Sequence, residues 1–509
     1  MSALLDAEQF MNAARHSSTT EAHFEQIPGM SVLSACPLVV DLDGTLIRTN
    51  MLHESVCGLF RENPGSLWRI PYWLWQGKAL LKQQMALHTT IDLRTLPFNR
   101  HFLAWLQQQR AQGRRLILCT ASDGSIARAI AEHLGIFDEV MASDGTTNLA
   151  GPHKAEALEQ RFGPSGFDYA GNSRADLAVW QRARRAVIVN PSAGVAKRAA
   201  SCCEVERAFP SAALGFTTWR RVLRMHQWLK NLLLFVPVIA AHQITNLDAW
   251  LALILAFCSF SLCASSVYIA NDLLDLESDR QHPVKCDRPF ASGLVPVWMG
   301  FLLAPLLLVS SLALARQAGG NFFPWLLAYV VLTFAYTLGL KRLLLIDCLT
   351  LAMLYTLRIV AGAAATGIGL SFWLLAFSSF LFLSLAFLKR YAELQILSQT
   401  GQQNAHGRAY CVSDAPLIQT FGIASGYAAA LVLALYLNSD TVMRLYRTPE
   451  FLWGVVPIMV FWITWMWTQA HRGHLHEDAI VFALKDPASL LAGVVLVALF
   501  TIGAMGWPW

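Results

Sequence analysis

The sequence has few charged residues for its length. Only 14% of its 509 residues are Asp, Glu, Lys or Arg, whereas a soluble domain averages about 25%. Hydrophobic residues make up 55% of the chain, with 17 Trp and 28 Phe, which is the composition of a membrane protein. The ten Cys include no CxxC pair, so they do not indicate a zinc or redox site. The net charge of +5 is too small to indicate a nucleic-acid partner.

Charge density divides the chain into two parts of different solvent class. Residues before about 200 carry ordinary charge, whereas long apolar stretches recur from Leu232 to the end. The N-terminus lacks the basic start and apolar core of a signal peptide, so we expect the first part in the cytoplasm. The expected organisation is a leader over 1–35, an α/β domain over 36–195 with a helical cap at about 49–106, a linker over 196–216 and a membrane domain over 217–509.

Short β-branched runs alternate with helical stretches in the first part, which predicts an open parallel sheet. In the second part, nine apolar segments are each about long enough to cross the bilayer, starting near residues 231, 250, 295, 322, 343, 371, 416, 451 and 489. Basic residues gather in alternate loops, and the positive-inside bias places those loops in the cytoplasm. We therefore expect an all-α membrane domain of nine transmembrane helices behind an α/β domain.

Three aspartates follow one another at the end of an apolar segment. Asp272, Asp275 and Asp279 have the spacing i, i+3, i+7, which on a helix gathers their carboxylates on one face, with Asn271 beside Asp275. Such carboxylates repel one another unless a divalent cation lies between them, and carboxylate oxygens suit Mg²⁺ that is bridged to substrate phosphates. The pattern predicts a magnesium site. A solvated acidic loop without metal is the alternative.

The run from Asn271 to Asp279 resembles the first aspartate-rich motif of the UbiA superfamily of prenyltransferases. That resemblance implies nine transmembrane helices around a cavity that faces the cytoplasm. The flanking sequence resembles one branch, decaprenyl-phosphate phosphoribosyltransferase, in which phosphoribosyl diphosphate (PRPP) is the donor and a polyprenyl phosphate the acceptor. The matching stretches are 224–231, 282–293, 336–341 and 389–394.

A second acidic cluster that would bind a prenyl diphosphate is missing, because Asp347 stands alone near Lys341, Arg342 and Arg358. Basic groups beside a single metal cluster suit a small, highly anionic donor. Asp347 is a further candidate metal ligand. The candidate substrate-binding residues are Gln227, Lys230, Asn271, Lys285, Arg288, Tyr336, Lys341, Arg358, Lys389 and Arg390. Each cation taken alone is also explained as a positive-inside anchor.

Asp41 and Asp43 follow a hydrophobic strand, with Gly44 and Thr45 after them. Two carboxylates at a strand end suit an aspartate nucleophile with a neighbouring acid/base. The pattern resembles motif I of the haloacid dehalogenase superfamily, and the later motifs follow in order at Thr120–Ser122, Lys154 and 169–176. The resemblance implies that Asp41 accepts the phosphoryl group, that Asp43 acts as acid/base, and that Thr120, Ser122 and Lys154 bind phosphate.

The same resemblance implies a second Mg²⁺, held by Asp41, Asp43, Asn172 and Asp176. Asn172 departs from the family pattern, which has a carboxylate there, and a neutral amide predicts weaker Mg²⁺ binding. A phosphoryl-binding domain without catalysis is the alternative for this part.

Together these patterns predict a bifunctional enzyme of a bacterial inner membrane with both active sites at the cytoplasmic face. Phosphoribosyl would pass from PRPP to decaprenyl or undecaprenyl phosphate, and the α/β domain would remove the 5-phosphate. We expect Mg²⁺ as cofactor, the bilayer as partner, no nucleic acid, and allow for a homo-oligomer. One alternative is a prenyltransferase for an aromatic or other acceptor with a regulatory phosphatase-like domain. The other is a transporter or scaffold with a phosphate-sensing domain.

Overall fold

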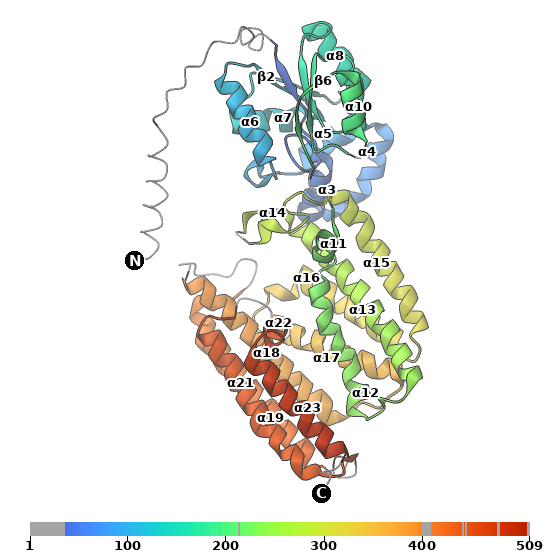
Figure 1. Ribbon diagram of the computed structural model, residues 1–509, viewed down its shortest axis with the longest axis vertical. Helices are drawn as coiled ribbons and strands as arrows, with labels where there is room; N and C mark the ends of the chain where they lie inside the picture. Colours follow the sequence, from blue (N-terminus) through green and yellow to red (C-terminus); the bar gives the residue numbers. More distant parts are fainter. Residues whose placement is uncertain are drawn as a thin grey trace. The chain divides into compact units, whose positions relative to one another are not determined.

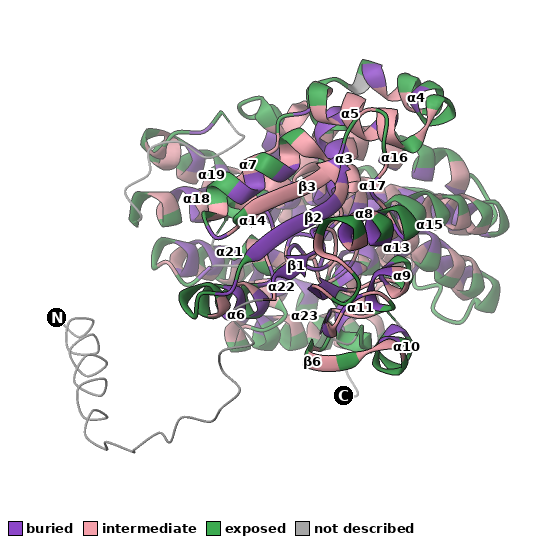
Figure 2. Ribbon diagram, turned by 90° about the horizontal axis from the view of Figure 1, so that it is seen from above, coloured by how far each residue is buried: buried purple, intermediate pink, exposed green. Residues whose placement is uncertain are grey.

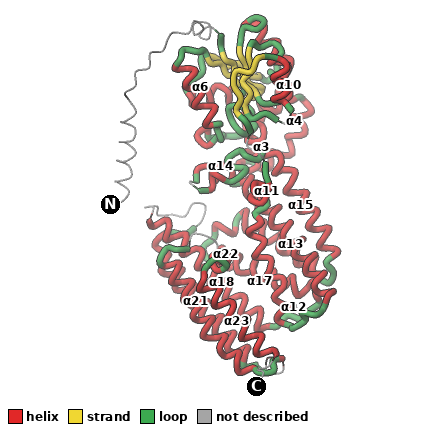
Figure 3. The backbone as a smooth tube through the Cα atoms, in the orientation of Figure 1, coloured by secondary structure: helices red, strands yellow, loops and turns green. Residues whose placement is uncertain are grey.

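The computed structural model describes residues 36–505 except 193, 212–213, 283, 400–408, 440–441, 443–444 and 476–478. The expected leader, residues 1–35, lies outside the described residues. The chain divides into two compact units, Met1–Ala212 and Ala213–Trp509 (Figure 1). Every strand that the structure describes belongs to the first unit (Figure 3).

The first unit is built on a six-stranded parallel sheet in the order β3-β2-β1-β4-β5-β6. At its centre, Val39 of β1 pairs with Ile117 of β2 on one side and with Tyr169 of β4 on the other. The predicted parallel α/β fold is confirmed. The strands are β1 (Leu38–Val40), β2 (Leu116–Asp123), β3 (Glu139–Ser143), β4 (Asp168–Gly171), β5 (Arg185–Val189) and β6 (Glu204–Phe209).

Helices cover both faces of this sheet, so its central strands are buried (Figure 2). Leu38 and Val40 share a core with Phe102 of α6 (Arg100–Ala111) and Ile130 of α7 (Gly124–Leu134). Side chains alternate along a strand, so Val39 packs on the opposite face, within a core that includes residues of three further helices. These are α8 (Pro152–Phe162), α9 (Leu177–Trp180) and α10 (Val195–Cys202).

A helical cap follows β1, over residues 51–95. It has its own small core of Leu59, Trp73, Leu81 and Met85. The cap ends earlier than the predicted residue 106, because the next helix, α6, buries its apolar side chains in the sheet core. Its elements are α3 (Met51–Glu62), η1 (Pro64–Arg69), α4 (Ile70–Gln76), α5 (Lys78–His88) and η2 (Leu93–Thr95).

The linker expected over 196–216 is wrong for most of its length. Helix α10 and strand β6 occupy 195–209, and β6 pairs in parallel with β5 at the edge of the sheet. This strand is hard to predict from the sequence, because Glu204, Glu206 and Arg207 interrupt its apolar residues. Charged side chains are usual on an edge strand, where they oppose pairing with other chains.

All the regular secondary structure that the structure describes in the second unit is helical. Seven helices among the described residues are long and apolar enough to cross a membrane. They are α13 (Leu247–Leu274), α15 (Val297–Gln317), α17 (Ile346–Thr366), α18 (Phe372–Gln399), α19 (Ala415–Leu437, preceded by η7, Val412–Asp414), α21 (Val455–His471, preceded by η8, Pro449–Gly454) and α23 (Pro487–Met505).

Two of the nine predicted spans have a different form. The one near 322 is α16 (Phe322–Leu338), an apolar helix of 17 residues. The one near 231 is a 3-10 helix, η4 (Met225–Phe235), continued by the short α12 (Val236–Ala240). The number nine therefore stays a prediction. The short connecting helices are α11 (Phe216–Val222), α14 (Leu276–Gln281), η5 (Lys285–Asp287), η6 (Leu340–Arg342) and α22 (Ala479–Ala483).

Candidate active sites

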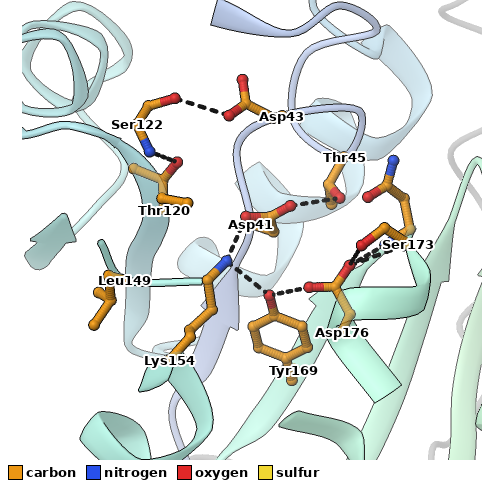
Figure 4. A network of polar contacts seen from close by, with 12 residues as sticks. Asp41, Asp43, Thr45, Thr120, Ser122, Leu149, Lys154, Tyr169, Ser173 and Asp176 are labelled. Atoms are coloured by element: carbon orange, nitrogen blue, oxygen red, sulfur yellow. Dashed lines mark hydrogen bonds and ion pairs between the residues drawn. The ribbon is translucent and has the colours of Figure 1, made fainter. Parts of the chain in front are cut away.

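A buried chain of polar contacts lies at the carboxyl end of the central strands of the first unit (Figure 4). Lys154, at the start of α8, donates to Asp41 Oδ1 at 2.6 Å and to the Tyr169 hydroxyl at 3.1 Å. Tyr169 in turn donates to Asp176 Oδ1 at 2.7 Å. The structure thus brings Asp41, Lys154 and Asp176 together through Tyr169, a residue of the last motif to which the sequence analysis gave no role.

Asp43 belongs to the same site but points toward the cap. Its Oδ2 accepts from the Ser122 hydroxyl at 2.8 Å, and its Oδ1 accepts from the backbone N–H of Met51, where α3 begins, at 2.8 Å. Thr120 is fully buried, and its hydroxyl accepts from the Ser122 backbone N–H at 3.0 Å. Both residues lie in the last part of β2, so the sheet edge and the cap together fix the Asp43 carboxylate.

Burial raises the pKa of Asp41 to about 7, and the nearby Asp176 and Asp43 add to this rise, whereas Lys154 opposes it. Burial alone would lower the pKa of Lys154, but Asp41 and other neighbours raise it, so the lysine stays charged. An excess of negative charge at a buried carboxylate is the environment that a divalent cation stabilises. The electrostatics of Asp41 therefore fit a bound Mg²⁺.

The four residues that the motifs predict as metal ligands lie in different hydrogen-bond environments. Asp176 Oδ2 accepts from the N–H groups of Asn172 and Ser173 and from the Ser173 hydroxyl, so this carboxylate organises the loop. The Asn172 amide packs over Gly44, where a Cβ would lie 2.0 Å from Asn172 Nδ2. Within the described ranges, no three His, Cys, Asp or Glu side chains form a metal-binding group. The four-residue magnesium site therefore stays a prediction.

Lys82 of the cap is a site residue that the sequence motifs missed. Its Nζ donates to the Ala121 carbonyl at 2.6 Å and to Asn148 Oδ1 at 3.1 Å. A cation therefore lies at the backbone of the residue between Thr120 and Ser122. Burial lowers the pKa of Lys82, whereas Asp43 and Asp41 raise it in part. It lies on the cap helix α5, far in sequence from every motif, so only the fold could reveal it.

The aspartates of the second unit lie at a break between two helices. Helix α13 ends at Leu274 and α14 starts at Leu276, so the single helix expected through Asp279 is wrong, although Asp279 N–H still bonds the Asp275 carbonyl at 2.8 Å. Asp272 and Asp279 nevertheless converge, because Arg288 Nη1 lies 3.2 Å from Asp272 Oδ1 and 2.5 Å from Asp279 Oδ2. The two carboxylates thus share one cationic side chain, and the magnesium site stays a prediction.

Three further basic residues surround these carboxylates. Arg224 forms an ion pair with Asp272, and Lys341 Nζ lies 3.8 Å from Asp275 Oδ2, which also accepts from Asn271 at 2.9 Å. Lys285 is exposed in η5. Burial raises the pKa of Asp279, and Arg288 and Lys285 oppose this rise. Lys285, Arg288 and Lys341, which were predicted to bind substrate, therefore lie near the predicted aspartates.

The 3-10 helix η4 packs along one stripe of α13. Asn231 bonds Ser261, Trp228 bonds Ser265, and Gln227 accepts weakly from Tyr268 at 3.4 Å. Arg224, which precedes η4 in a left-handed backbone conformation (φ 48°), covers the Tyr268 ring and reaches Asp272. Residues 261, 265, 268 and 272 lie on one helical face. Arg224 and Tyr268 are thus neighbours of the aspartates that the expected site did not include.

Asp347 lies in a different environment. Its side chain is 0% exposed, and its carboxylate accepts from Arg390 Nε, from Arg390 Nη2 at 3.0 Å and from the Tyr336 hydroxyl at 2.9 Å. Arg390 is 1% exposed and also bonds Glu393. These contacts join α16, α17 and α18. The structure therefore places Asp347, Tyr336 and Arg390 in one buried ion-pair network, and their part in metal or substrate binding stays a prediction.

Arg358 is likewise engaged inside the unit. It donates to Asn231 Oδ1 at 3.0 Å, to the Tyr329 hydroxyl at 3.0 Å and to a backbone carbonyl of its own helix. The structure gives it a packing role that the sequence did not predict. Lys230 is buried over the Tyr355 ring, and Lys389 is half-buried on α18.

Comparison with known proteins adds two family matches. The haloacid dehalogenase-like hydrolase model matches residues 38–181, and the UbiA prenyltransferase family model matches residues 232–485. An uncharacterized protein of Sinorhizobium fredii is 37% identical over 92% of this chain and 90% of its own length. Nodulation protein NoeC of Azorhizobium caulinodans is 36% identical over 55% of this chain and 91% of its own length.

A more limited similarity connects this chain to an enzyme. Decaprenyl-phosphate phosphoribosyltransferase of Mycolicibacterium smegmatis is 38% identical over 36% of this chain and 58% of its own length. Among solved structures, a UbiA homologue from Archaeoglobus fulgidus bound to GPP and Mg²⁺ aligns with 56% of this chain and 99% of its own length, at 17% identity and a TM-score of 0.43.

Proposed function

The chain belongs to the UbiA prenyltransferase family and carries a haloacid dehalogenase-like domain, and from this premise we propose that it makes a lipid-linked ribose in two steps. The multi-pass membrane unit transfers 5-phosphoribosyl from PRPP to a polyprenyl phosphate and releases diphosphate. The α/β unit then hydrolyses the 5-phosphate to give polyprenyl-phosphoryl ribose. Both resemblances expected from the motifs are confirmed by the family matches, and the two reactions are the proposal.

The arrangement of cations around one aspartate group carries the transferase assignment. Arg224 and Arg288 pair with Asp272, Arg288 also pairs with Asp279, and Lys341 lies beside Asp275. Asp347, at the start of α17, has its oxygens filled by Arg390 and Tyr336. A single metal site with several cations suits a donor that carries a diphosphate and a second phosphate, because guanidinium groups bind phosphate oxygens in pairs.

The partial similarity to decaprenyl-phosphate phosphoribosyltransferase supports the same donor and acceptor. Asp272, Asp275 and Asp279 would hold Mg²⁺, which when bound would neutralise charge on the diphosphate leaving group. Arg224, Arg288 and Lys341 would then be released from the carboxylates to bind phosphate. Lys285, which is exposed, is placed to attract the anionic donor from water.

The phosphatase step is supported by the fixed geometry around Asp41. Lys154 orients the nucleophilic carboxylate from one side. Asp43 is held by Ser122 and the Met51 N–H at the entrance from the cap, where it can give a proton to the leaving oxygen and later take one from water. A phosphatase on the same chain would receive the transferase product at a raised effective concentration. The basic loops favour a cytoplasmic location for both sites, at the inner membrane of a bacterium.

The proposal is tested by giving purified protein PRPP, undecaprenyl phosphate and Mg²⁺ and following ribosylated lipid and free phosphate together. We expect a lipid-linked ribose and one phosphate per lipid beyond the released diphosphate. Asp41→Asn should leave lipid ribosylation intact and stop phosphate release, so that the phosphorylated intermediate accumulates.

Asp272→Asn is the matched variant for the other unit and should abolish ribosylation while leaving hydrolysis of a supplied phosphorylated lipid unchanged. An absence of ribosylated lipid from the wild-type protein would refute the transferase assignment. A prenyl diphosphate that competes with PRPP and is itself consumed would identify a prenyltransferase instead. Unchanged phosphate release by Asp41→Asn would refute the phosphatase assignment alone.

A further inference from the structure

The cap of the first unit exposes an unusual set of apolar side chains. Among the described residues of this unit, all the exposed large hydrophobic side chains belong to the cap, namely Phe60, Trp68, Tyr72, Leu74, Trp75 and Leu87. Trp68, Tyr72 and Trp75 are 73%, 56% and 83% exposed. They lie on η1 and α4, close together in the chain, and a soluble domain rarely leaves a contiguous apolar patch without a partner.

The exposure is selective and does not reflect a poorly packed cap. Trp73 lies between the exposed aromatic residues in sequence, yet it is buried with Leu59, Leu81 and Met85. The cap therefore forms its own core and presents the other rings outward. Trp and Tyr have an amphipathic ring that is favoured where hydrocarbon meets lipid headgroups.

The chain segment that carries these rings contains basic residues but no acidic ones. Between Glu62 and Asp92 the sequence has no acidic residue, whereas it has Arg69, Lys78 and Lys82. Arg69 and Lys78 are exposed, and the Arg69 guanidinium lies 5.6 Å from the centre of the Trp68 ring. Exposed aromatic rings beside basic side chains complement a surface of anionic lipid headgroups.

We propose that the cap surface formed by Trp68, Tyr72 and Trp75 with Arg69 and Lys78 binds the headgroup region of the lipid bilayer. A lipid surface is the expected occupant because the same chain continues into membrane-spanning helices. Strand β6 ends at Phe209 and α11 begins at Phe216, so the chain between them reaches at most about 25 Å. The tether keeps the first unit within reach of the bilayer, where even a weak surface affinity is effective.

The same cap also forms part of the Asp41 site. Helix α5 brings Lys82 to the Ala121 carbonyl, and the Met51 N–H at the start of α3 holds Asp43. A cap seated on the headgroups would therefore bring the Asp41 site, to which the cap contributes Lys82 and the Met51 N–H, close to the membrane surface. This consequence rests on the proposed phosphatase function, whereas lipid binding by the cap does not.

Site-specific photocrosslinking in the full-length protein tests the proposal. A benzophenone amino acid replaces Trp75 or, in a second variant, Trp68, and the protein is reconstituted in nanodiscs of phosphatidylethanolamine and phosphatidylglycerol. Both side chains are exposed, so their replacement removes no core contact. The control carries the same probe at Gln112, which is exposed just before β2 and therefore at the opposite, amino-end edge of the sheet.

We expect lipid adducts by mass spectrometry at positions 68 and 75, with at least a fivefold lower yield at 112. Equal yields at all three positions, or no lipid adduct at 68 and 75, would overturn the proposal. Adducts between these positions and residues of the second unit, or a second copy of the chain, in place of lipid would show that a protein surface covers the rings and would overturn it as well. Because the readout is an adduct, the result is independent of whether the protein proves to be a phosphatase.

Discussion

The buried ion pair between Asp347 and Arg390 allows a direct test of whether the Asp347 carboxylate is structural or binds a metal. Both side chains are almost completely buried, and Tyr336 and Glu393 complete the network. The perturbation is Asp347→Asn, which preserves size but removes the charge that Arg390 faces. If the structural interpretation is right, this change should lower stability and leave the Mg²⁺ requirement of the enzyme unaltered.

The expected magnitude follows from burial. Removing one partner of a buried ion pair costs about 3–5 kcal/mol, because the remaining charge is left without compensation. Asn keeps an oxygen that can still accept from Arg390, so we expect the lower part of that range. One kcal/mol shifts the Tm of a domain of ~150–250 residues by roughly 2–4 °C, and the second unit is somewhat larger, so a loss of roughly 5–10 °C is expected. Tyr336→Phe removes the hydroxyl that donates to Asp347 and accepts from Arg390, and because both partners are charged it should cost about 1.5–3 kcal/mol.

The assay is thermal unfolding of purified wild-type and variant protein in detergent, combined with product formation across a Mg²⁺ titration below the unfolding temperature. A double variant, Asp347→Leu with Arg390→Met, should recover much of the lost stability, because an apolar pair of similar volume avoids the desolvation of both charges. The reasoning is refuted if Asp347→Asn keeps the wild-type Tm while the Mg²⁺ concentration for half-maximal activity rises severalfold, since that is the behaviour of a metal ligand.

Three further predictions concern the two sites. In steady-state kinetics, Arg288→Met should lower kcat/KM for PRPP by about 10–100-fold, as expected for a lost charge-assisted hydrogen bond. Arg288→Lys should be intermediate, and equal rates for the wild type and both variants would contradict a phosphate-binding role. Gly44→Ala should destabilise the first unit by more than about 1 kcal/mol in thermal unfolding, because φ is +77° and the new Cβ meets Asn172. Since burial raises the pKa of Asp41 to about 7 from an ordinary 3.8, its ionisation opposes folding of the metal-free chain, so stability in EDTA should fall as pH rises from about 4 to about 7. Asp41→Asn should remove this part of the pH dependence of Tm, and an unchanged profile would show that Asp41 is already ionised in the metal-free fold.

The sequence predicted the architecture well where its pattern was strong. The run Leu38–Val40 and its counterparts in β2 and β5 are apolar and β-branched, and they form buried parallel strands because both faces of the sheet are covered. Strand β6 was not predicted because its charged residues, which are usual on an edge strand, break the apolar pattern. The end of the cap was misplaced because Phe102 and Trp105 have the same helical spacing as cap residues, and only tertiary contact assigns them to the sheet core.

The sequence predicted which residues gather at the sites, but not the hydrogen-bond or ion-pair partner of each residue. Thr120, Ser122, Lys154, Asp41 and Asp43 were placed correctly as one group, because consecutive parallel strands bring their carboxyl ends to one edge of the sheet. Lys82 and Tyr268 were missed because the residues that they contact lie far away in sequence or across a helix face, and no local pattern marks them. Arg224 lies in a stretch that resembles the transferase branch, but its ion pair with Asp272 was not predicted.

The contrast between Asp347 and the aspartates after α13 shows what a sequence leaves open. Asp272, Asp279 and Asp347 all lie in or near the ends of apolar helices, each with arginine nearby, and their type alone does not distinguish a ligand from an ion-pair partner. The distinction lies in which groups pair with the carboxylate oxygens. Asp347 faces one arginine and one hydroxyl that close around it from two helices, so its charge is compensated inside the fold. Asp272 and Asp279 share Arg288, whose side chain is 26% exposed and comes from a separate loop, so another cation could take its place without disrupting a core. A carboxylate whose countercharge is partly exposed and replaceable is suited to exchange that countercharge for Mg²⁺, and one whose countercharge is built into the core is suited to hold helices together.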